Sequence, residues 1–368
     1  MKSPWLASLT VAAFSLTAHA AVPAGFDAAA QALGRQWLLD NDGVGLTIGV
    51  YDDGQKHFFN FGATRLDGDR LPTKDTVYEI GSVAKTFAAQ LLARAVIEGR
   101  AALDDDVTKY LDEKYPNFTK DGEPIRLLHL ANMTSQLVDN IPDVTQVRLV
   151  ESTPLAATKM MVYRKYTRVE LLRQLHRIAP RAKPGGEPGQ SNVAAMLLMV
   201  ILERIYGEPF DKLLAREIEK PLRLSSGTAP IVKLLARGYS RAGEELPTFD
   251  AEMSWVTGSL RYGADDLLKY AAWQMMERDA SVKLAHKPTW TAPNQTQAVA
   301  LYWLTTGSPQ GRRVYYSGGT YGFASVCDLY PESRIAVVLL SNKDADRAQE
   351  TLRALSAKIV ALARPASP

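Results

Sequence analysis

Short β-type segments lie near both ends of this chain, and a long stretch of helical patterns separates them. Near the N-terminus, Val44–Tyr51 and His57–Phe61 flank Asp52-Asp53-Gly54, which predicts a β-hairpin. The C-terminal third contains further β-type runs separated by Gly, Pro and Ser, at residues 298–304, 312–316, 322–330 and 335–340. This order predicts one sheet that is assembled from both ends of the chain.

Helical patterns fill the rest of the sequence. Their expected ranges are residues 26–39, 82–99, a segment opened by a Thr167–Glu170 capping box, 192 to about 205, and about 345–363. We therefore predict an α/β fold, with a mixed sheet that is flanked by helices and built from both chain ends, plus an all-α insertion. Residues 21–81 and 290–368 would form the α/β lobe and residues 82–289 a mainly helical lobe. The cleft between them is the default place for a site.

Residues 1–20, MKSPWLASLTVAAFSLTAHA, have the features of an export signal. Lys2 precedes an apolar run, and Ala18-His19-Ala20 supplies the small residues at which a signal peptidase cuts. The run is shorter than the roughly 20 residues that span a bilayer, which favours a cleaved signal over an anchor. We expect cleavage after Ala20, no transmembrane segment in the mature protein, and a periplasmic or otherwise secreted location.

The composition argues against several classes of function. The chain has 368 residues, a formal net charge of +3 and a single cysteine, Cys327. The small charge gives no argument for nucleic-acid binding, and one cysteine cannot form an intramolecular disulfide or a multi-cysteine metal site. No His-x-x-x-His or comparable signature indicates metal ligands. We expect no cofactor and no metal, and we expect Cys327 to be a packed strand residue.

Ser82 and Lys85 stand three residues apart at the start of a predicted helix. That spacing places both side chains on one helix face, about a turn apart. A lysine that loses its proton in a desolvated pocket can accept the serine proton as attack begins, and the helix N-terminus favours the oxyanion. Such a tetrapeptide also occurs by chance, and by itself it equally fits a helix N-cap followed by a solvated lysine.

Further motifs follow Ser82 in order along the chain. VYEIGSVAKTF at residues 77–87 contains the serine, and IRLLHLANMTS at 125–135, Gln190-Ser191-Asn192 and YSGGTYGF at 316–323 come after it. Together they resemble the serine β-lactamase and penicillin-binding-protein superfamily, specifically its class C β-lactamase-like branch. The resemblance covers most of the mature chain, and it implies a β-lactamase/transpeptidase-like fold.

The resemblance also implies the roles of individual residues. Ser82 would be acylated by a β-lactam, a D-alanyl peptide or a small ester, with Lys85 as its proton partner. Asn192 would hold Lys85 and the substrate amide, and the backbone amides of Ser82 and Gly319 would form the oxyanion hole. Further substrate contacts are implied for Asn140, Ser317 and Gly318. The substrate would be a small molecule or a cell-wall peptide.

Two positions depart from the family pattern. The second motif normally begins with a tyrosine that passes protons near the nucleophile, but this chain has Gln190, whose amide cannot take up or give a proton near neutral pH. The third motif normally opens with Lys or His, but this chain has Tyr316. A neutral phenol offers no charge, which should weaken recognition of a substrate carboxylate.

These departures leave two functions open. The first is an exported serine hydrolase, slow or redirected, in which Tyr316 supplies the missing phenol and the substrate has no essential carboxylate. The second is a penicillin- or peptidoglycan-peptide-binding pseudoenzyme or sensor that does not turn over. General acid–base catalysis is worth roughly 10² to 10⁴ in rate, so the missing tyrosine predicts a slow enzyme more firmly than a dead one.

Two other features have a simple structural interpretation. His129 lies in an apolar helical stretch without a Gly-x-Ser-x-Gly elbow, so we favour a structural role over a Ser-His-Asp triad. The segment 159–183 is rich in basic side chains, which fits a solvated helix face or a rim that attracts an anionic envelope polymer. These side chains are Lys159, Arg164, Lys165, Arg168, Arg173, Arg177, Arg181 and Lys183.

Overall fold

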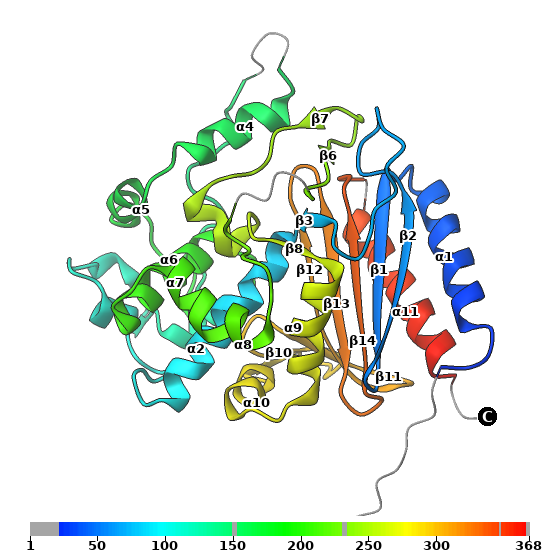
Figure 1. Ribbon diagram of the computed structural model, residues 1–368. Coiled ribbons are helices and arrows are strands. Elements are labelled where there is room, and N and C mark those ends of the chain that lie inside the picture. The colour runs from blue at the N-terminus through cyan, green and yellow to red at the C-terminus, as the bar shows by residue number, and fades with distance from the viewer. Residues whose placement is uncertain (1–21, 149–152, 230–233, 346, 366–368) are drawn as a thin grey trace, which may run out of the picture.

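The computed structural model describes residues 22–148, 153–229, 234–345 and 347–365 (Figure 1). The predicted signal peptide, residues 1–20, lies outside the described residues. The main sheet has eight strands in the order β2-β1-β14-β13-β12-β11-β10-β9, and neighbouring strands run antiparallel. They are β1 Gly45–Asp52, β2 Gln55–Gly62, β9 Trp290–Thr291, β10 Ala298–Val299, β11 Leu304–Ser308, β12 Gly311–Gly319, β13 Ala324–Tyr330 and β14 Ile335–Ser341.

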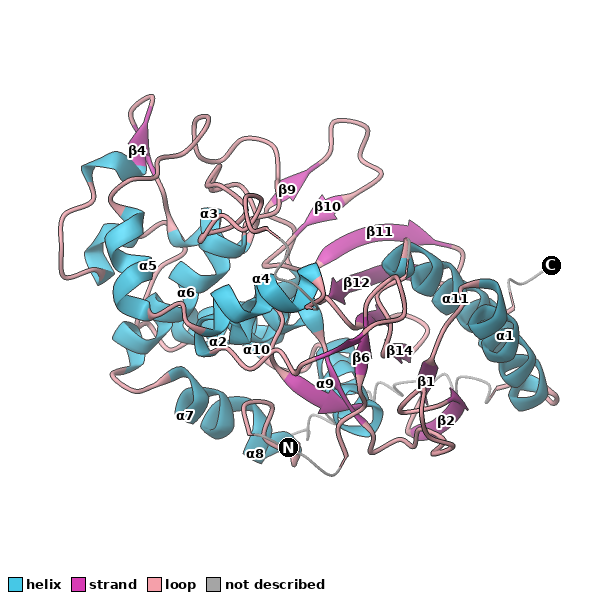
Figure 2. Cartoon of the chain, turned by 90° about the horizontal axis from the view of Figure 1, so that it is seen from above, coloured by secondary structure: helices cyan, strands magenta, loops and turns pink. Residues whose placement is uncertain are grey.

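Helices lie on both sides of this sheet, α1 and α11 side by side on one face and the helical region on the other (Figures 1 and 2). The helices are α1 Phe26–Asp40, α2 Ala84–Ile97, α3 Leu127–Ala131, α4 Leu155–Arg164, α5 Arg168–Leu175, α6 Asn192–Tyr206, α7 Phe210–Leu214, α8 Lys220–Leu222, α9 Ala264–Met276, α10 Ala280–His286 and α11 Ala348–Ala363. Three small ribbons pair β3 Val77–Glu79 with β8 Arg261–Gly263, β4 Thr119–Lys120 with β5 Glu123–Pro124, and β6 Gly238–Tyr239 with β7 Glu245–Leu246. The predicted α/β fold with flanking helices is confirmed.

The two chain ends meet where β1 pairs with β14, in a register that runs from Leu46 opposite Ser341 to Asp52 opposite Ile335. Every residue of β14 is buried, because its alternate side chains face opposite layers. Val337 and Leu339 pack in the cluster that contains α1 and α11, whereas the neighbouring valine and leucine side chains join the larger core of the helical region. The central strands are therefore held from both faces.

Helix α9 belongs to the predicted helical segment 82–289, but it packs against strands β1, β13 and β14 of the sheet. Its first turn continues directly from β8, so the chain returns to the sheet at this point. The larger core consequently runs without interruption from the helical region onto the sheet. This continuity gives strand β12 a fixed position beside the N-terminus of α2.

The sequence predicted one continuous strand at residues 298–304, and this prediction was wrong for the middle of the segment. The chain forms β10, turns over residues 300–303 and then forms β11, with a positive φ of 56° at Tyr302. Tyr302 and Trp303 are almost completely buried, and the backbone N–H of Tyr302 donates to the carbonyl of Ala131. Burial of two large aromatic side chains in the core therefore overrides local β propensity here.

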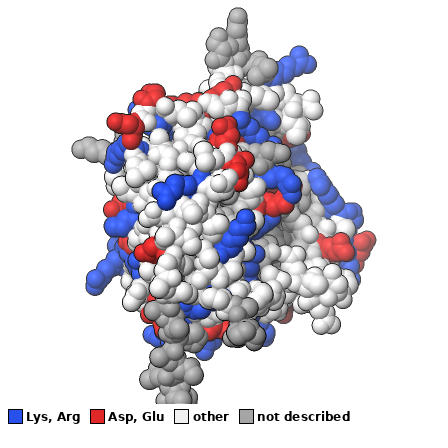
Figure 3. All heavy atoms as spheres, turned by 90° about the vertical axis from the view of Figure 1, so that its right-hand side faces the viewer, with Lys and Arg blue, Asp and Glu red and all other residues white. Residues whose placement is uncertain are grey.

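Two observations concern membrane spans and the charge on one face of the molecule. No helix among the described residues is long and apolar enough to cross a bilayer. On the face that carries α1 and α11, acidic and basic side chains are interspersed (Figure 3). This distribution agrees with the small net charge of the sequence.

Replacement of Leu339 by Ala tests the central position of β14. Leu339 is 0% exposed, so Leu339→Ala should lower the free energy of unfolding by about 2–5 kcal/mol. Leu39→Ala is the matched control, because Leu39 is 77% exposed on α1 and its loss should change stability by about 0.5 kcal/mol or less. Equilibrium denaturant unfolding measures both, and equal losses would contradict this assignment of the core.

Candidate active site

Ser82 lies in a 3₁₀ turn, Gly81–Val83, that leads directly into helix α2. Lys85 Nζ donates a hydrogen bond to Ser82 Oγ over 3.0 Å. Lys85 is only 1% exposed, and this burial lowers the pKa of its amine to about 8, although the nearby Asp139 carboxylate acts in the opposite direction. Roughly one amine in ten is then unprotonated at pH 7 and can accept the serine proton.

The nucleophile turn touches strand β12 through backbone atoms. A Cβ on Gly81 would lie 2.3 Å from the backbone nitrogen of Gly319, and one on Gly318 would lie 2.3 Å from the carbonyl oxygen of Ile80. The position of a Cβ on Gly318 is also 2.6 Å from the Ser82 nitrogen. Glycine is therefore required on both sides of this contact. The amides of Ser82 and Gly319 consequently lie beside each other, as an oxyanion site needs.

The open end of β12 provides an edge for a substrate. Strand β11 pairs with β12 only as far as Tyr315, so residues 316–319 have β13 on one side and no β11 partner on the other. Ser325 of β13 donates a 2.6 Å hydrogen bond to the carbonyl of Ile80, which joins this part of the sheet to the segment before Ser82. The unpaired edge of β12 thus runs past the nucleophile.

Two asparagines predicted to contact substrate lie together on the helical side. Asn192 Nδ2 donates to Asn140 Oδ1 over 2.8 Å, and Asn140 Nδ2 donates to Asp139 Oδ2 over 2.8 Å. The Oδ1 atom of Asn192 is buried and has no hydrogen-bond partner in the described part of the chain. No hydrogen bond joins Asn192 to Lys85 among these residues, so the Asn192 carbonyl oxygen is available to a substrate N–H.

Tyr316 and Gln190 meet next to this cluster. Gln190 Nε2 donates to Tyr316 Oη over 3.5 Å, and Tyr316 Oη donates to Met133 Sδ over 3.5 Å. Tyr316 is 2% exposed, and burial raises the pKa of its phenol to about 12. The phenol therefore stays protonated near neutral pH and can donate a proton or a hydrogen bond, but it is a poor general base.

Ser317 points toward helix α11. Its hydroxyl donates to Gln349 Oε1 over 3.2 Å and accepts from Arg353 Nη1 over 3.2 Å. Arg353 and Gln349 carry no motif in the sequence, and only their place on the packed helix brings them to β12. Because side chains alternate along a strand, Ser317 and Arg353 lie on the α11 face of β12, whereas Tyr316 faces the helical region.

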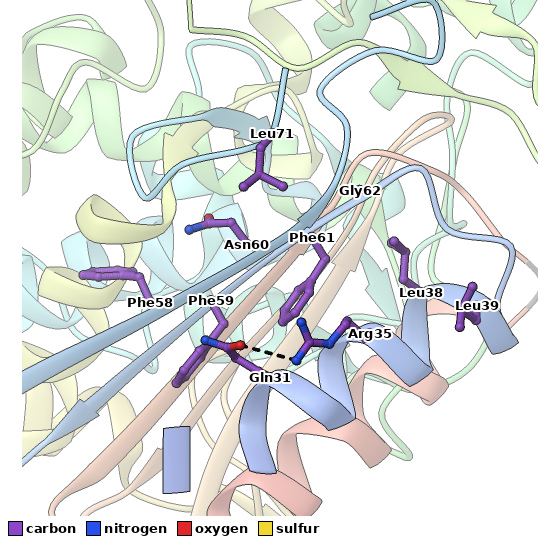
Figure 4. A pocket seen from close by; sticks show the side chains of 10 residues that line it. All are labelled: Gln31, Arg35, Leu38, Leu39, Phe58, Phe59, Asn60, Phe61, Gly62 and Leu71. Atoms are coloured by element: carbon purple, nitrogen blue, oxygen red, sulfur yellow. Dashed lines mark hydrogen bonds between the residues drawn. The ribbon is translucent and has the colours of Figure 1, made fainter. Parts of the chain in front are cut away.

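A cleft of about 360 Å³ opens between Asn140, Asn192 and Gly319. Its remaining wall includes a cluster of aromatic side chains, in which Phe249 packs edge-to-face with Tyr163 and Tyr321 at centroid distances of 5.9 and 6.3 Å. A larger cavity of about 570 Å³ lies between α1 and edge strand β2, but none of the motif residues lines it (Figure 4). The smaller cleft is therefore the candidate active site.

The sequence model of the β-lactamase family matches residues 26–361. The chain belongs to the β-lactamase family. A β-lactamase from Pseudomonas fluorescens is 23% identical over 351 residues, which are 85% of this chain and 92% of that protein. The D-alanyl-D-alanine-carboxypeptidase/endopeptidase AmpH of Escherichia coli K12 is 24% identical over 369 residues, which are 92% of this chain and 91% of that protein.

Solved structures of the β-lactamase fold match more than nine tenths of the chain. A β-lactamase/D-alanine carboxypeptidase from Pseudomonas syringae superposes with a TM-score of 0.76 at 20% identity and covers 94% of this chain and 100% of its own. A class C β-lactamase superposes with a TM-score of 0.77 at 18% identity, over 91% of this chain and 96% of its own. The family resemblance predicted from the motifs is confirmed.

Cys327 and His129 have structural positions in this β-lactamase-family chain. Cys327 is completely buried in β13, so the prediction of a packed strand residue is confirmed. His129 Nδ1 accepts a 3.2 Å hydrogen bond from the backbone N–H of Arg126 at the start of α3. Burial lowers the pKa of the His129 imidazole, so the neutral ring that this capping contact requires is favoured.

The lowered pKa of Lys85, about 8, predicts how the acylation rate depends on pH. The neutral amine accepts the serine proton, so the acylation rate should rise about tenfold per pH unit below pH 8 and level off above it. Intact-protein mass spectrometry at successive times between pH 6 and pH 9 measures this rate. Lys85→Arg, which keeps the charge but cannot lose the proton, should show no acylation. A rate independent of pH would contradict the role of Lys85.

Proposed function

We propose that this protein is an exported serine hydrolase that forms an acyl-enzyme on Ser82 and releases the acyl group slowly to water. The observation that carries this proposal is the 3.0 Å contact between the buried Lys85 amine and Ser82 Oγ. β-Lactams, D-alanyl peptides and small esters are the proposed substrates, since similar proteins are described as a β-lactamase and a D-alanyl-D-alanine carboxypeptidase/endopeptidase.

In the acylation step, Ser82 Oγ attacks the substrate carbonyl carbon while its proton moves to neutral Lys85. The amides of Ser82 and Gly319 stabilise the negative oxygen of the tetrahedral intermediate. As the bond to the leaving group breaks, the leaving oxygen or nitrogen takes a proton from Lys85 or from the hydroxyl of Tyr316. Water then attacks the ester on Ser82, which regenerates the serine and releases a carboxylic acid.

Deacylation is the slow step in this proposal. Gln190 cannot remove a proton from water, and Tyr316, with a pKa raised to about 12, is a poor base near neutrality. A persistent acyl-enzyme, as in a penicillin-binding protein or sensor that does not turn over, is therefore the second candidate function. Gln190 is the residue that favours it.

Recognition of a substrate carboxylate is proposed to depend on Arg353. Its Nη1 atom donates to Ser317 Oγ over 3.2 Å, and Arg353 lines a small pocket that shares Gly319 and Gln349 with the cleft. A guanidinium can pair with a carboxylate in two parallel hydrogen bonds, so Arg353 offers a positive charge to a substrate carboxylate at the Gly319 end of the cleft. This contact keeps penicillins and D-alanyl peptides among the proposed substrates alongside neutral esters.

Export is proposed from the pattern of residues 1–20. The backbone N–H of Val22 donates to Asp52 Oδ2 of strand β1 over 3.0 Å. Val22 lies just beyond the expected cleavage after Ala20, so the mature chain would keep this contact.

Substitution of Tyr316 tests the mechanism. Tyr316→Phe removes the hydroxyl that can protonate the leaving group during acylation, so kcat/KM for a small ester should fall by about 10² to 10⁴. Tyr302→Phe is the matched control, because Tyr302 packs edge-to-face on Tyr316 and its own hydroxyl has no partner among the described residues. Steady-state ester hydrolysis measures both variants, with Ser82→Ala as the inactive reference.

Two results would go against this mechanism. Unchanged hydrolysis in Tyr316→Phe would remove the phenol from the chemistry, and equal losses in both tyrosine variants would indicate a packing effect. Gln190→Tyr should increase the rate of deacylation, because it restores a phenol at the second motif. If Gln190→Tyr leaves a persistent adduct, deacylation is limited by something other than this position.

A further inference from the structure

Glu79 is the last residue of β3 and stands three residues before Ser82. Its side chain is 1% exposed, and each carboxyl oxygen accepts one hydrogen bond. The backbone N–H of Phe249 donates to Oε1 over 2.6 Å, and Thr320 Oγ1 donates to Oε2 over 2.8 Å. Because Phe249 and Thr320 both line the cleft, one buried carboxyl joins the nucleophile segment to two parts of the cleft wall.

The charged groups around Glu79 come from two further segments. Arg261 of β8 pairs in register with Glu79, and its guanidinium donates to Asp250 Oδ1 over 3.3 Å. Burial raises the pKa of the Glu79 carboxyl to about 7, although its two hydrogen bonds and the Arg261 charge act in the opposite direction. The Asp250 carboxylate raises this pKa further. Both protonation states of Glu79 are therefore accessible near neutral pH.

The protonation state of Glu79 determines what Thr320 can offer to a substrate. An ionised carboxylate only accepts, so the Thr320 hydrogen is directed to Glu79. The Thr320 oxygen also accepts from the backbone N–H of Gly322 over 3.4 Å, and one lone pair remains. A protonated carboxyl can itself donate to Thr320, and the hydroxyl hydrogen of Thr320 can then turn to another acceptor.

We propose that Glu79 is a positioning residue that holds the Phe249 and Thr320 walls of the cleft and sets the hydrogen-bonding polarity of Thr320 toward the substrate. With Glu79 ionised, Thr320 accepts from an N–H on the acyl side of the substrate. With Glu79 protonated, Thr320 donates to a carbonyl or carboxylate oxygen. The inference rests on the proposed function, since it concerns the substrates that acylate Ser82.

Glu79→Gln tests this inference, because the amide can accept from Phe249 but must donate to Thr320. The probes are two esters with the same leaving group, one with an acylamino N–H beside the carbonyl and one with a hydrocarbon chain there. In the wild type, the ratio of kcat/KM for the acylamino ester to that for the hydrocarbon ester should fall about fivefold to tenfold from pH 8 to pH 6. In Glu79→Gln the ratio should stay low at every pH.

The matched control is Glu219→Gln. Glu219 is also a buried glutamate, and its Oε1 accepts from the backbone N–H of Gly227 over 2.7 Å and from Tyr262 Oη over 2.8 Å, but it does not line the cleft. This variant should keep the pH dependence of the wild-type ratio. The inference is overturned if Glu79→Gln retains the wild-type dependence, or if Glu219→Gln abolishes it equally.

Thermal unfolding gives a second readout that needs no activity. The folded-state pKa of Glu79 is raised, so its contribution to stability is fully present below about pH 4.5 and is lost as pH rises toward 7. The Tm of the wild type relative to Glu79→Gln should therefore fall between pH 5 and pH 8. A constant Tm difference overturns the inference. If no ester acylates Ser82 but the Tm difference changes as expected, the proposed function fails and the buried Glu79–Thr320 contact stands.

Discussion

The nucleophile turn and strand β12 touch through their backbones, and most of the active-site geometry follows from this contact. A side chain on Gly81 or Gly318 would overlap backbone atoms of the opposite segment. Because neither glycine has a side chain, the amides of Ser82 and Gly319 can lie side by side. Such closeness requires the sheet to be fixed relative to α2, and the uninterrupted core from the helical region onto β13 and β14 provides that constraint.

Burial acts on both sides of Ser82 and changes two ionisable groups in the direction that favours their neutral forms. It lowers the pKa of the Lys85 amine to about 8 and raises the pKa of the Glu79 carboxyl to about 7. The two groups lie within six residues of each other but face different neighbours. Lys85 contacts the nucleophile, whereas Glu79 contacts the cleft wall. Desolvation therefore prepares Lys85 for proton transfer, and it sets the protonation state with which Glu79 positions the cleft wall.

The sequence predicted the sheet, the main helices and the family because these depend on local periodicity and on motifs that stay together along the chain. It also predicted the positions of Ser82 and Lys85, which a single helix turn brings together. It did not indicate Arg353 or the aromatic wall around Phe249, because tertiary packing alone brings residues from α11 and from long loops to the cleft. Tyr302 and Trp303 show the same limit, since core burial turned a β-type run into a bend.

Intact-protein mass spectrometry with peptide mapping tests directly whether Ser82 forms an acyl-enzyme. The mature protein is incubated with a penicillin, a cephalosporin and an activated ester, and the mass is followed over time beside Ser82→Ala. We predict an adduct of one acyl group on the peptide that contains Ser82, with slow decay of this adduct and no adduct in Ser82→Ala. An adduct on another residue, or no adduct and no released product with any of the three, would contradict it.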